Sequence, residues 1–148
     1  MTEAPAGFHL IDVGGEYIRV NGPLWLFRDG TDVRLGFRVE PRHTNGMLIC
    51  HGGMMATFCD MLLPLTARSL VAELEGNFLP TINLQVDYIA PSRIGEWVEG
   101  QAQVLKFTRR MVFMQGLVTA DGALVARTSG MLKVGRKSDD SGGAATAR

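Results

Sequence analysis

The fold of this 148-residue chain is decided by residues 51–70, HGGMMATFCDMLLPLTARSL. Two glycines open the stretch, and the residues after them are apolar almost without interruption, which predicts a buried helix over about residues 52–73. Pro64 removes one backbone hydrogen bond from this helix and is expected to kink it. Asp60 is the single carboxylate of the stretch. Because burial of a charge is costly, an acid at this position is expected to have a function.

Strand patterns flank the predicted helix on both sides. Before it, residues 23–28 and 33–39 are rich in β-forming residues and are separated by a predicted turn at residues 29–32. After it, the strand pattern recurs in four segments, 81–89, 97–106, 111–119 and 123–134. Asp121-Gly122, between the last two, is typical of a hairpin turn. This order predicts an α+β domain in which a curved antiparallel sheet wraps a long central helix.

One domain is expected over residues 23–136, because 148 residues with 46% hydrophobic content can build a single core. Residues 1–22 are weakly patterned and are expected to form an arm, either as a short helix or as an ordered segment. Residues 137–148 are rich in Ser, Gly and Ala, which predicts a disordered tail. The N-terminus lacks the basic-then-apolar order of a signal peptide, so a cytoplasmic location is expected.

Charge and motif content argue against several classes of function. Fifteen basic and fifteen acidic residues give a net charge of zero, so neither nucleic acid nor a membrane is expected as a partner. The three histidines and the two cysteines, Cys50 and Cys59, show no metal-ligand spacing, and no metal is expected. The sequence also lacks the serine-hydrolase elbow, the phosphate-binding loop and the dinucleotide-binding glycine pattern.

A motif around the start of the predicted helix resembles that of a known family. Asn45 lies six positions before the histidine of His51-Gly52-Gly53, and Asp60 lies nine positions after it. This pattern resembles the signature of hot-dog fold acyl-CoA thioesterases, of the phenylacetate-pathway and hydroxybenzoyl-CoA thioesterase-like type. The similarity extends over most of residues 33–134. It implies a hot-dog fold and hydrolysis of a short-to-medium or aromatic acyl-CoA, with no cofactor because coenzyme A is part of the substrate.

The two glycines suit the polarisation of a thioester carbonyl. Free N–H groups at a helix start stabilise negative charge on an oxygen, and residues without a Cβ let that oxygen approach. The resemblance implies that the amide of Gly52 is the donor, with Gly53 beside it in the coenzyme A site. The alternative is a plain helix start that needs glycine for its backbone angles.

His51 is expected either to assist the leaving thiolate or only to order the loop. Asn45 is expected either to orient the water or the nucleophile or only to form the Asn-Gly turn.

Asp60 is the candidate nucleophile or general base, and the sequence leaves both roles open. A structural alternative is a buried acid that is hydrogen-bonded to Thr57 or Thr81. Similar enzymes carry a hydroxyl residue at the position of Thr81, which is therefore a candidate assistant to the acid. Asp60 lies eight residues after Gly52, about 12 Å along a helix, so one chain cannot place both on one carbonyl. A homodimer with shared active sites is therefore expected, and pairing of dimers into a tetramer is left open.

A local basic cluster is the candidate site for the phosphates of coenzyme A. It consists of Lys106, Arg109 and Arg110, between two predicted strands. Solvated strand ends are the alternative explanation.

The rival function is a non-catalytic acyl-CoA binding or sensing domain, which would keep the glycine-rich helix start but would not need a buried acid at position 60.

Overall fold

The glycine-led stretch forms helix α2, Gly52–Leu70, in a computed structural model that describes residues 3–138. The helix continues through Pro64. It ends at Leu70 rather than at residue 73, because Val71 is extended and the chain turns into the short 3-10 helix η2, Ala72–Leu74. A second 3-10 helix, η1, Pro41–His43, precedes α2. No helix among the described residues is long and apolar enough to span a bilayer.

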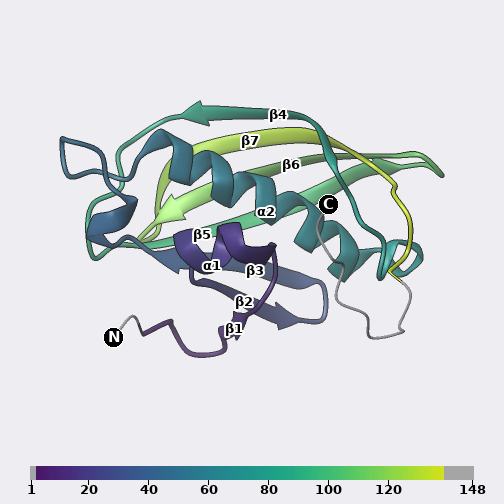
Figure 1. Ribbon diagram of the computed structural model, residues 1–148, viewed down its shortest axis with the longest axis horizontal. Coiled ribbons are helices and arrows are strands. Elements are labelled where there is room, and N and C mark those ends of the chain that lie inside the picture. The colour runs from purple at the N-terminus through teal and green to yellow at the C-terminus, as the bar shows by residue number, and fades with distance from the viewer. Residues whose placement is uncertain (1–2, 139–148) are drawn as a thin grey trace.

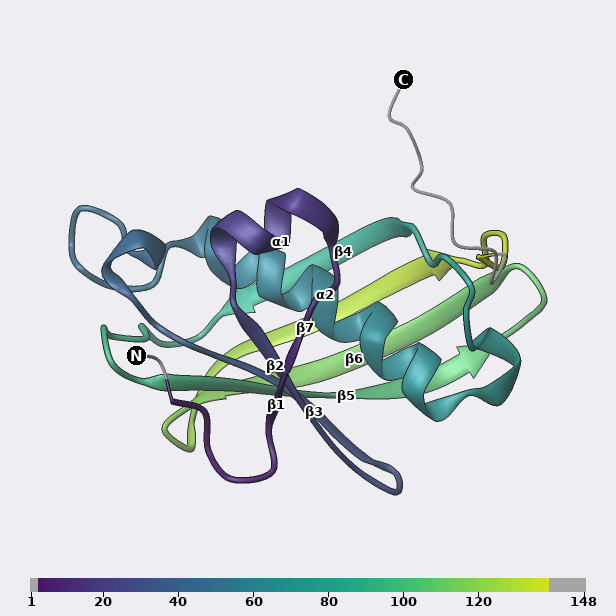
Figure 2. The ribbon, with the colours of Figure 1, turned by 60° about the horizontal axis from the view of Figure 1, so that its bottom comes forward.

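Within residues 3–138, seven strands form one antiparallel sheet in the order β1-β2-β3-β5-β6-β7-β4 (Figure 1). Their bounds are β1 His9–Ile11, β2 Leu24–Asp29, β3 Asp32–Arg38, β4 Thr81–Tyr88, β5 Trp97–Phe107, β6 Met111–Ala120 and β7 Ala123–Lys133. The six predicted strands are all present, with bounds within one residue of the prediction. The sheet curves around α2, as Figure 2 shows from a second direction. The expected α+β hot-dog architecture is confirmed.

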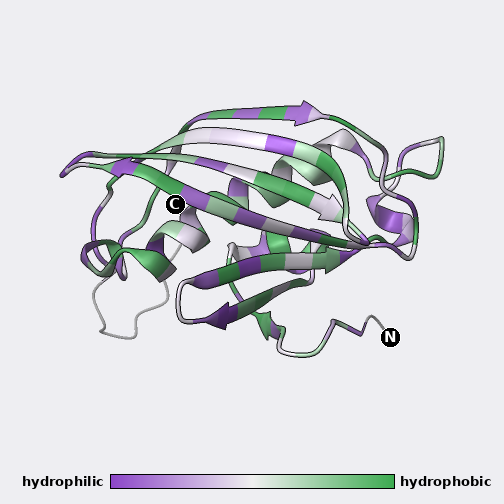
Figure 3. Ribbon diagram, turned by 180° about the vertical axis from the view of Figure 1, so that it is seen from behind, coloured by the Kyte–Doolittle hydropathy of each residue, from purple (hydrophilic) through white to green (hydrophobic). Residues whose placement is uncertain are grey.

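Alternation along the strands places apolar side chains on the face that packs against α2. Phe37 of β3 contacts Phe58 of α2 at a ring-centroid distance of 5.1 Å, and both are fully buried. Gly100 of β5 allows α2 to approach closely, because a Cβ there would lie 2.7 Å from Leu62. Figure 3 shows the resulting alternation of hydrophilic and hydrophobic residues along the strands. The core therefore lies between the concave face of the sheet and one face of α2.

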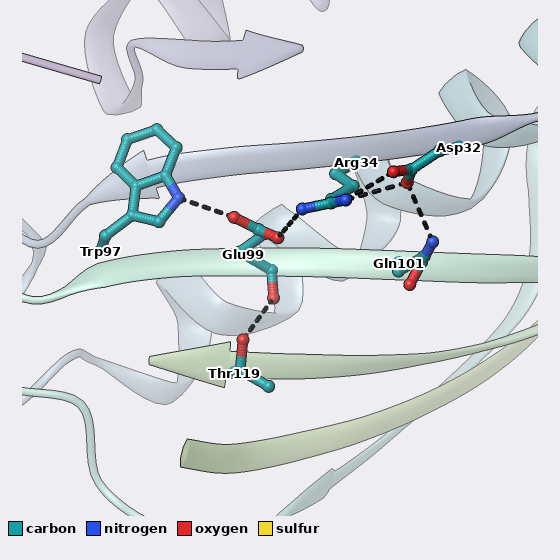
Figure 4. Close-up of polar contacts among 6 residues, drawn as sticks. All are labelled: Asp32, Arg34, Trp97, Glu99, Gln101 and Thr119. Carbon is teal, nitrogen blue, oxygen red and sulfur yellow. Dashed lines mark hydrogen bonds and ion pairs between the residues drawn. The ribbon is translucent and has the colours of Figure 1, made fainter. Parts of the chain in front are cut away.

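On the outer face of the sheet, Arg34 links β3 to β5 (Figure 4). Its guanidinium donates to both carboxylate oxygens of Asp32 and, at 3.3 Å, to Glu99, which also accepts from the indole N–H of Trp97 at 3.1 Å. Hydrogen bonding to Arg34 lowers the pKa of Asp32, and hydrogen bonding to Asp32 raises the pKa of Arg34. These residues lie on the side of the sheet away from α2, so we assign the network to sheet stability.

The N-terminal residues wrap one edge of the sheet. β1 pairs with β2, and helix α1, Gly15–Asn21, lies beside the first half of α2 (Figure 2). Phe8 packs edge-on against Trp97 on the outer face, whereas Ile18 of α1 belongs to the main core cluster. The weakly patterned arm thus contains both a strand and a helix, and the domain boundary at residue 22 stays a prediction. The predicted tail falls outside the described residues from position 139 onward.

His43 joins α1 to the loop before α2, a role that the sequence did not indicate. Its side chain is 3% exposed. Nδ1 accepts the backbone N–H of Glu40 at 3.0 Å, so in the neutral ring the proton lies on Nε2, which donates to the carbonyl oxygen of Asn21 at 2.8 Å. The buried imidazole therefore satisfies one backbone group on each of two segments.

Replacing His43 with leucine is expected to lower the free energy of unfolding by about 2 kcal/mol, because two backbone polar groups lose a partner. Urea unfolding followed by circular dichroism measures this change. His9→Leu is the matched control, because His9 is exposed on β1. Equal stability of the two variants would show that the His43 hydrogen bonds contribute nothing to the fold.

Candidate functional site

The start of α2 presents an unused backbone donor. Nδ1 of His51 accepts the N–H of Gly53 at 2.8 Å, and the carbonyl oxygen of His51 accepts the N–H of Met55 at 3.1 Å. His51 is therefore the N-cap of α2, which is an ordering role, and its Nε2 remains free to carry the ring proton. Among the described residues, no acceptor takes the N–H of Gly52. That N–H, at the positive end of the helix, is available to an oxygen of a ligand.

Neither backbone conformation nor packing explains a glycine at position 52. Gly52 is helical and has no positive φ. A Cβ there would make only an ordinary contact, 3.4 Å from the ring of Tyr88. Glycine in a helix costs about 1 kcal/mol relative to alanine. The interpretation that this helix start needs glycine for its backbone angles therefore finds no support at Gly52.

Gly52 opens into a cavity of about 400 Å³ between the loop before α2, the end of β4 and the start of β7. Asn45 lines the same cavity. Its carboxamide oxygen accepts the N–H of Met47 at 2.9 Å, so Asn45 does form the turn, while its amide nitrogen has no acceptor within the described residues. Tyr88 donates from its hydroxyl to the carbonyl oxygen of Gly52 at 2.7 Å. Partial burial raises the pKa of Tyr88, which therefore stays a donor at neutral pH.

Asp60 is exposed in the single chain, and the expectation of a buried acid is wrong. The reason is helical spacing: the neighbours of Asp60 on its own face of α2 include Gly53, Ala56 and Thr57, not the large apolar residues adjacent in sequence. Its Oδ1 accepts the hydroxyl of Thr81 at 2.6 Å. The structure therefore brings Asp60 and Thr81 together, a contact that fits both the catalytic and the structural interpretation of the sequence.

Gly52 and Asp60 face different cavities of the single chain. Asp60 lines a cavity of about 430 Å³ with Tyr17 and Thr57, and a second of about 610 Å³ with Thr81, whereas Gly52 borders neither. Asp60 lies eight positions after Gly52 on α2, about 12 Å along the axis. One chain therefore does not bring both groups to the same carbonyl.

The predicted basic cluster, Lys106, Arg109 and Arg110, belongs to the β5–β6 hairpin, whose turn lies at the other end of the sheet from the start of α2 (Figure 1). Val125 near the start of β7 lines the Gly52 cavity, whereas Val134, just after β7, donates its N–H to the carbonyl oxygen of Arg110. The two valines are about 30 Å apart at the usual rise of an extended strand. These cations do not reach the Gly52 cavity of their own chain.

The cysteines do not supply a nucleophile at neutral pH. Burial raises the pKa of Cys50 to about 11 and that of Cys59 to about 12, so both thiols stay protonated. Among the described residues, no three His, Cys, Asp or Glu side chains cluster in a way that could hold a metal ion. The carboxylate of Asp60 is therefore the candidate for attack or proton abstraction.

Sequence reasoning missed two tyrosines at these cavities. Tyr88 appeared as one more residue of an alternating strand, and no local pattern marks its contact with Gly52. Tyr17 lies in the weakly patterned arm, but it lines the Asp60 cavity and its hydroxyl lies 3.1 Å from that of Thr57. Both contacts join segments far apart in the chain, so neither leaves a signal in a single sequence.

Comparison with known proteins shows the family to which the chain is related. The family model described as the thioesterase superfamily matches residues 47–126. Human acyl-coenzyme A thioesterase 13 is 29% identical over 92 residues, which cover 61% of this chain and 64% of that protein. The match therefore spans slightly less than two thirds of the human protein.

Two solved structures share the fold. Zebra fish thioesterase superfamily member 2 has a TM-score of 0.69 at 25% identity, covering 84% of this chain and 88% of that one. A hypothetical thioesterase protein of Streptococcus pneumoniae with coenzyme A has a TM-score of 0.67 at 19% identity, covering 88% of this chain and 98% of that one. At this low identity, the second likeness concerns the fold alone.

Proposed function

The chain belongs to the thioesterase superfamily, and from this premise we propose that it is a cytoplasmic acyl-CoA thioesterase of the phenylacetate-pathway type. Its substrate is a short-to-medium or aromatic acyl-CoA, which it hydrolyses to the free acid and coenzyme A. The observation that carries the proposal is the free N–H of Gly52 at the open start of α2. A thioester carbonyl that accepts this N–H gains negative charge when it is attacked, and the helix start stabilises that charge.

The acid in this reaction is Asp60 of the partner subunit. It either attacks the carbonyl carbon, giving an anhydride that water then hydrolyses, or takes a proton from the attacking water. In both routes the C–S bond breaks and the thiolate of coenzyme A leaves. His51 stands at the same helix start with its Nε2 free to donate to that sulfur. Thr81 orients the carboxylate through its 2.6 Å hydrogen bond.

The surface around Asp60 supports a homodimer. β4 ends the sheet order, so within the described chain one of its edges has no neighbouring strand. Large apolar side chains are exposed along this edge and beside it, with Phe78 at 67%, Ile82 at 56% and Ile89 at 51%. An open strand edge next to exposed apolar groups favours pairing with another chain.

Sharing of the site sets the direction of the two helices. If the two helices were parallel and related by a two-fold axis, Gly52 of one subunit and Asp60 of the other would remain about 12 Å apart along the axis, which is the rise of eight helical residues. Antiparallel helices instead place each Gly52 beside Asp60 of the partner subunit. They also direct the basic hairpin at the far end of one chain toward the Gly52 end of the other. The phosphates of a coenzyme A bound at the partner's Gly52 end would then be contacted by Lys106, Arg109 and Arg110. Gly53, next to Gly52, would border the same substrate.

Release of thiol from a panel of acyl-CoA esters tests the proposed function. The panel contains acetyl, hexanoyl, decanoyl, phenylacetyl and benzoyl esters, and the released coenzyme A is measured with a chromogenic disulfide. We expect turnover of at least one of these esters. Binding of acyl-CoA without thiol release would overturn the proposal in favour of the binding or sensing function.

Mixing two inactive variants tests the shared site. Gly52→Ala and Asp60→Asn subunits are each expected to retain no more than about 1% of the native activity as homodimers, whereas a mixed dimer contains one site with both native residues. Random exchange makes about half of the dimers mixed, so about a quarter of the native activity is expected to return. Thiol release after co-refolding of equal amounts measures it. Recovery no greater than the sum of the separate variants would contradict a site built from two chains.

A further inference from the structure

The peptide group between Gly52 and Gly53 is held at both of its polar ends by side chains. The hydroxyl of Tyr88 donates to its carbonyl oxygen at 2.7 Å, and Nδ1 of His51 accepts its N–H at 2.8 Å. His51 is the adjacent N-cap, but Tyr88 lies 36 residues away, at the end of β4. The ring of Tyr88 also lies 3.4 Å from the position that a Cβ on Gly52 would take.

The Tyr88 hydrogen bond is not required by either partner. In an α-helix, the carbonyl oxygen of residue 52 already accepts the N–H of the residue four positions later. Tyr88 is 59% exposed in the single chain, so in that chain water can satisfy its hydroxyl. The hydrogen bond from Tyr88 is therefore required neither by burial nor by the helix. It is made to the peptide group next to the free N–H of Gly52, which indicates a role at the site.

We propose that Tyr88 is a positioning residue that fixes the Gly52 amide for the reaction. The inference rests on the proposed thioesterase function. Two consecutive glycines have wide backbone freedom, and the first turn of a helix frays readily. Tyr88 and His51 together fix the plane of the peptide that follows Gly52, while the hydrogen bond from Met55 to the carbonyl of His51 fixes the plane before it. With both planes fixed, the N–H of Gly52, a residue that lines the cavity, keeps one direction.

A fixed donor matters more for the rate than for binding. The oxygen that develops negative charge in the transition state needs the N–H to be aligned in advance, whereas the neutral thioester carbonyl is held mainly by the rest of the substrate. Tyr88 thus acts through Gly52, and its removal is expected to lower kcat rather than to raise KM.

The test compares Tyr88→Phe with the native enzyme on the best ester of the panel. Loss of one ordinary hydrogen bond is expected to lower kcat about 3- to 10-fold, with KM changed by less than about two-fold. Asp87→Asn is the matched control: Asp87 neighbours Tyr88 on β4, pairs with Arg127 at 2.8 Å and lines neither the Gly52 nor the Asp60 cavity. We expect native kcat for this control.

Two-dimensional amide NMR gives a readout besides activity, in which Tyr88→Phe is expected to shift the Gly52 and Gly53 resonances and to speed the hydrogen exchange of these two amides.

The outcomes separate the inference from the function on which it rests. A native enzyme that turns over thioesters, together with a Tyr88→Phe variant of native kcat, overturns the inference alone. A variant that raises KM at native kcat also overturns it, because Tyr88 would then be a substrate contact. A native enzyme without thioesterase activity removes the proposed function and the inference with it. A fall in kcat with unchanged Gly52 and Gly53 resonances would contradict positioning as the cause.

Discussion

Replacement of Asp60 with asparagine is expected to lower kcat by a factor on the order of 10² to 10⁴ while leaving the fold intact. A carboxamide neither attacks a thioester carbonyl nor accepts a proton from water at neutral pH. Its oxygen can still accept the hydroxyl of Thr81, so the local hydrogen bond survives. Asp60 is exposed and forms no ion pair within the described residues, so the unfolding temperature should change little. Thiol release and thermal unfolding measure the two quantities.

The matched control for this substitution is Asp87→Asn, which makes the same chemical change on a nearby strand. Asp87 pairs with the exposed Arg127, and its loss is expected to affect neither turnover nor, by more than a few tenths of a kcal/mol, stability. Native turnover by Asp60→Asn would remove the catalytic assignment of the acid. A large fall in both variants would indicate that surface charge, not the chemistry of Asp60, controls the assay.

The strands and the central helix could be predicted from the sequence because their signals are local. Alternation of polar and apolar residues and the Asp121-Gly122 turn set strand bounds that the structure reproduces within one residue. The start of α2 was also predicted, since His51-Gly52-Gly53 marks it directly. Its end at Leu70 was not, because the extended backbone of Val71 depends on packing of the following turn in the core.

The environment of the candidate acid could not be predicted in the same way. In sequence, Asp60 lies among Cys59, Met61 and Leu62, which suggests burial. In three dimensions, side chains that lie three and four residues apart share a helical face, and on the face of Asp60 the chain leaves this side chain exposed, although Tyr17 of α1 contacts Thr57 there. The separation of Gly52 from Asp60, in contrast, follows from helical rise alone, which is why a shared site could be inferred before the structure was known.

Contacts between distant segments were the least predictable part of the site. The hydrogen bond from Tyr88 to Gly52 spans 36 residues, and that between Tyr17 and Thr57 spans 40. Tyr88 lies within the part of the chain over which the family resemblance extends, but the resemblance assigns it no role, and Tyr17 lies outside that part. The curvature of the sheet brings the end of β4 to the start of α2, and this is a property of the whole sheet rather than of any stretch of sequence.

Replacement of Gly52 with alanine is expected to separate stability from activity. A Cβ at this position would contact only the Tyr88 ring at an ordinary 3.4 Å, and alanine is the better helix former. The free energy of unfolding should therefore stay the same or rise by up to about 1 kcal/mol. The same methyl group would occupy the space through which a thioester oxygen approaches the N–H. We expect kcat/KM to fall about 100-fold, which is the effect of losing one oxyanion donor.

Gly100→Ala provides the opposite pattern and thus the control. A Cβ at Gly100 would lie 2.7 Å from Leu62 in the core and far from the Gly52 cavity, so this variant should lose about 1–3 kcal/mol of stability but retain kcat where it is folded. Urea unfolding and thiol release, measured on both variants, give the comparison. If Gly52→Ala instead lost stability together with activity, the glycine would serve the backbone of the helix. If it kept its activity, the Gly52 amide would not be the donor, because the reaction would then tolerate a methyl group at the one place where the substrate oxygen must pass.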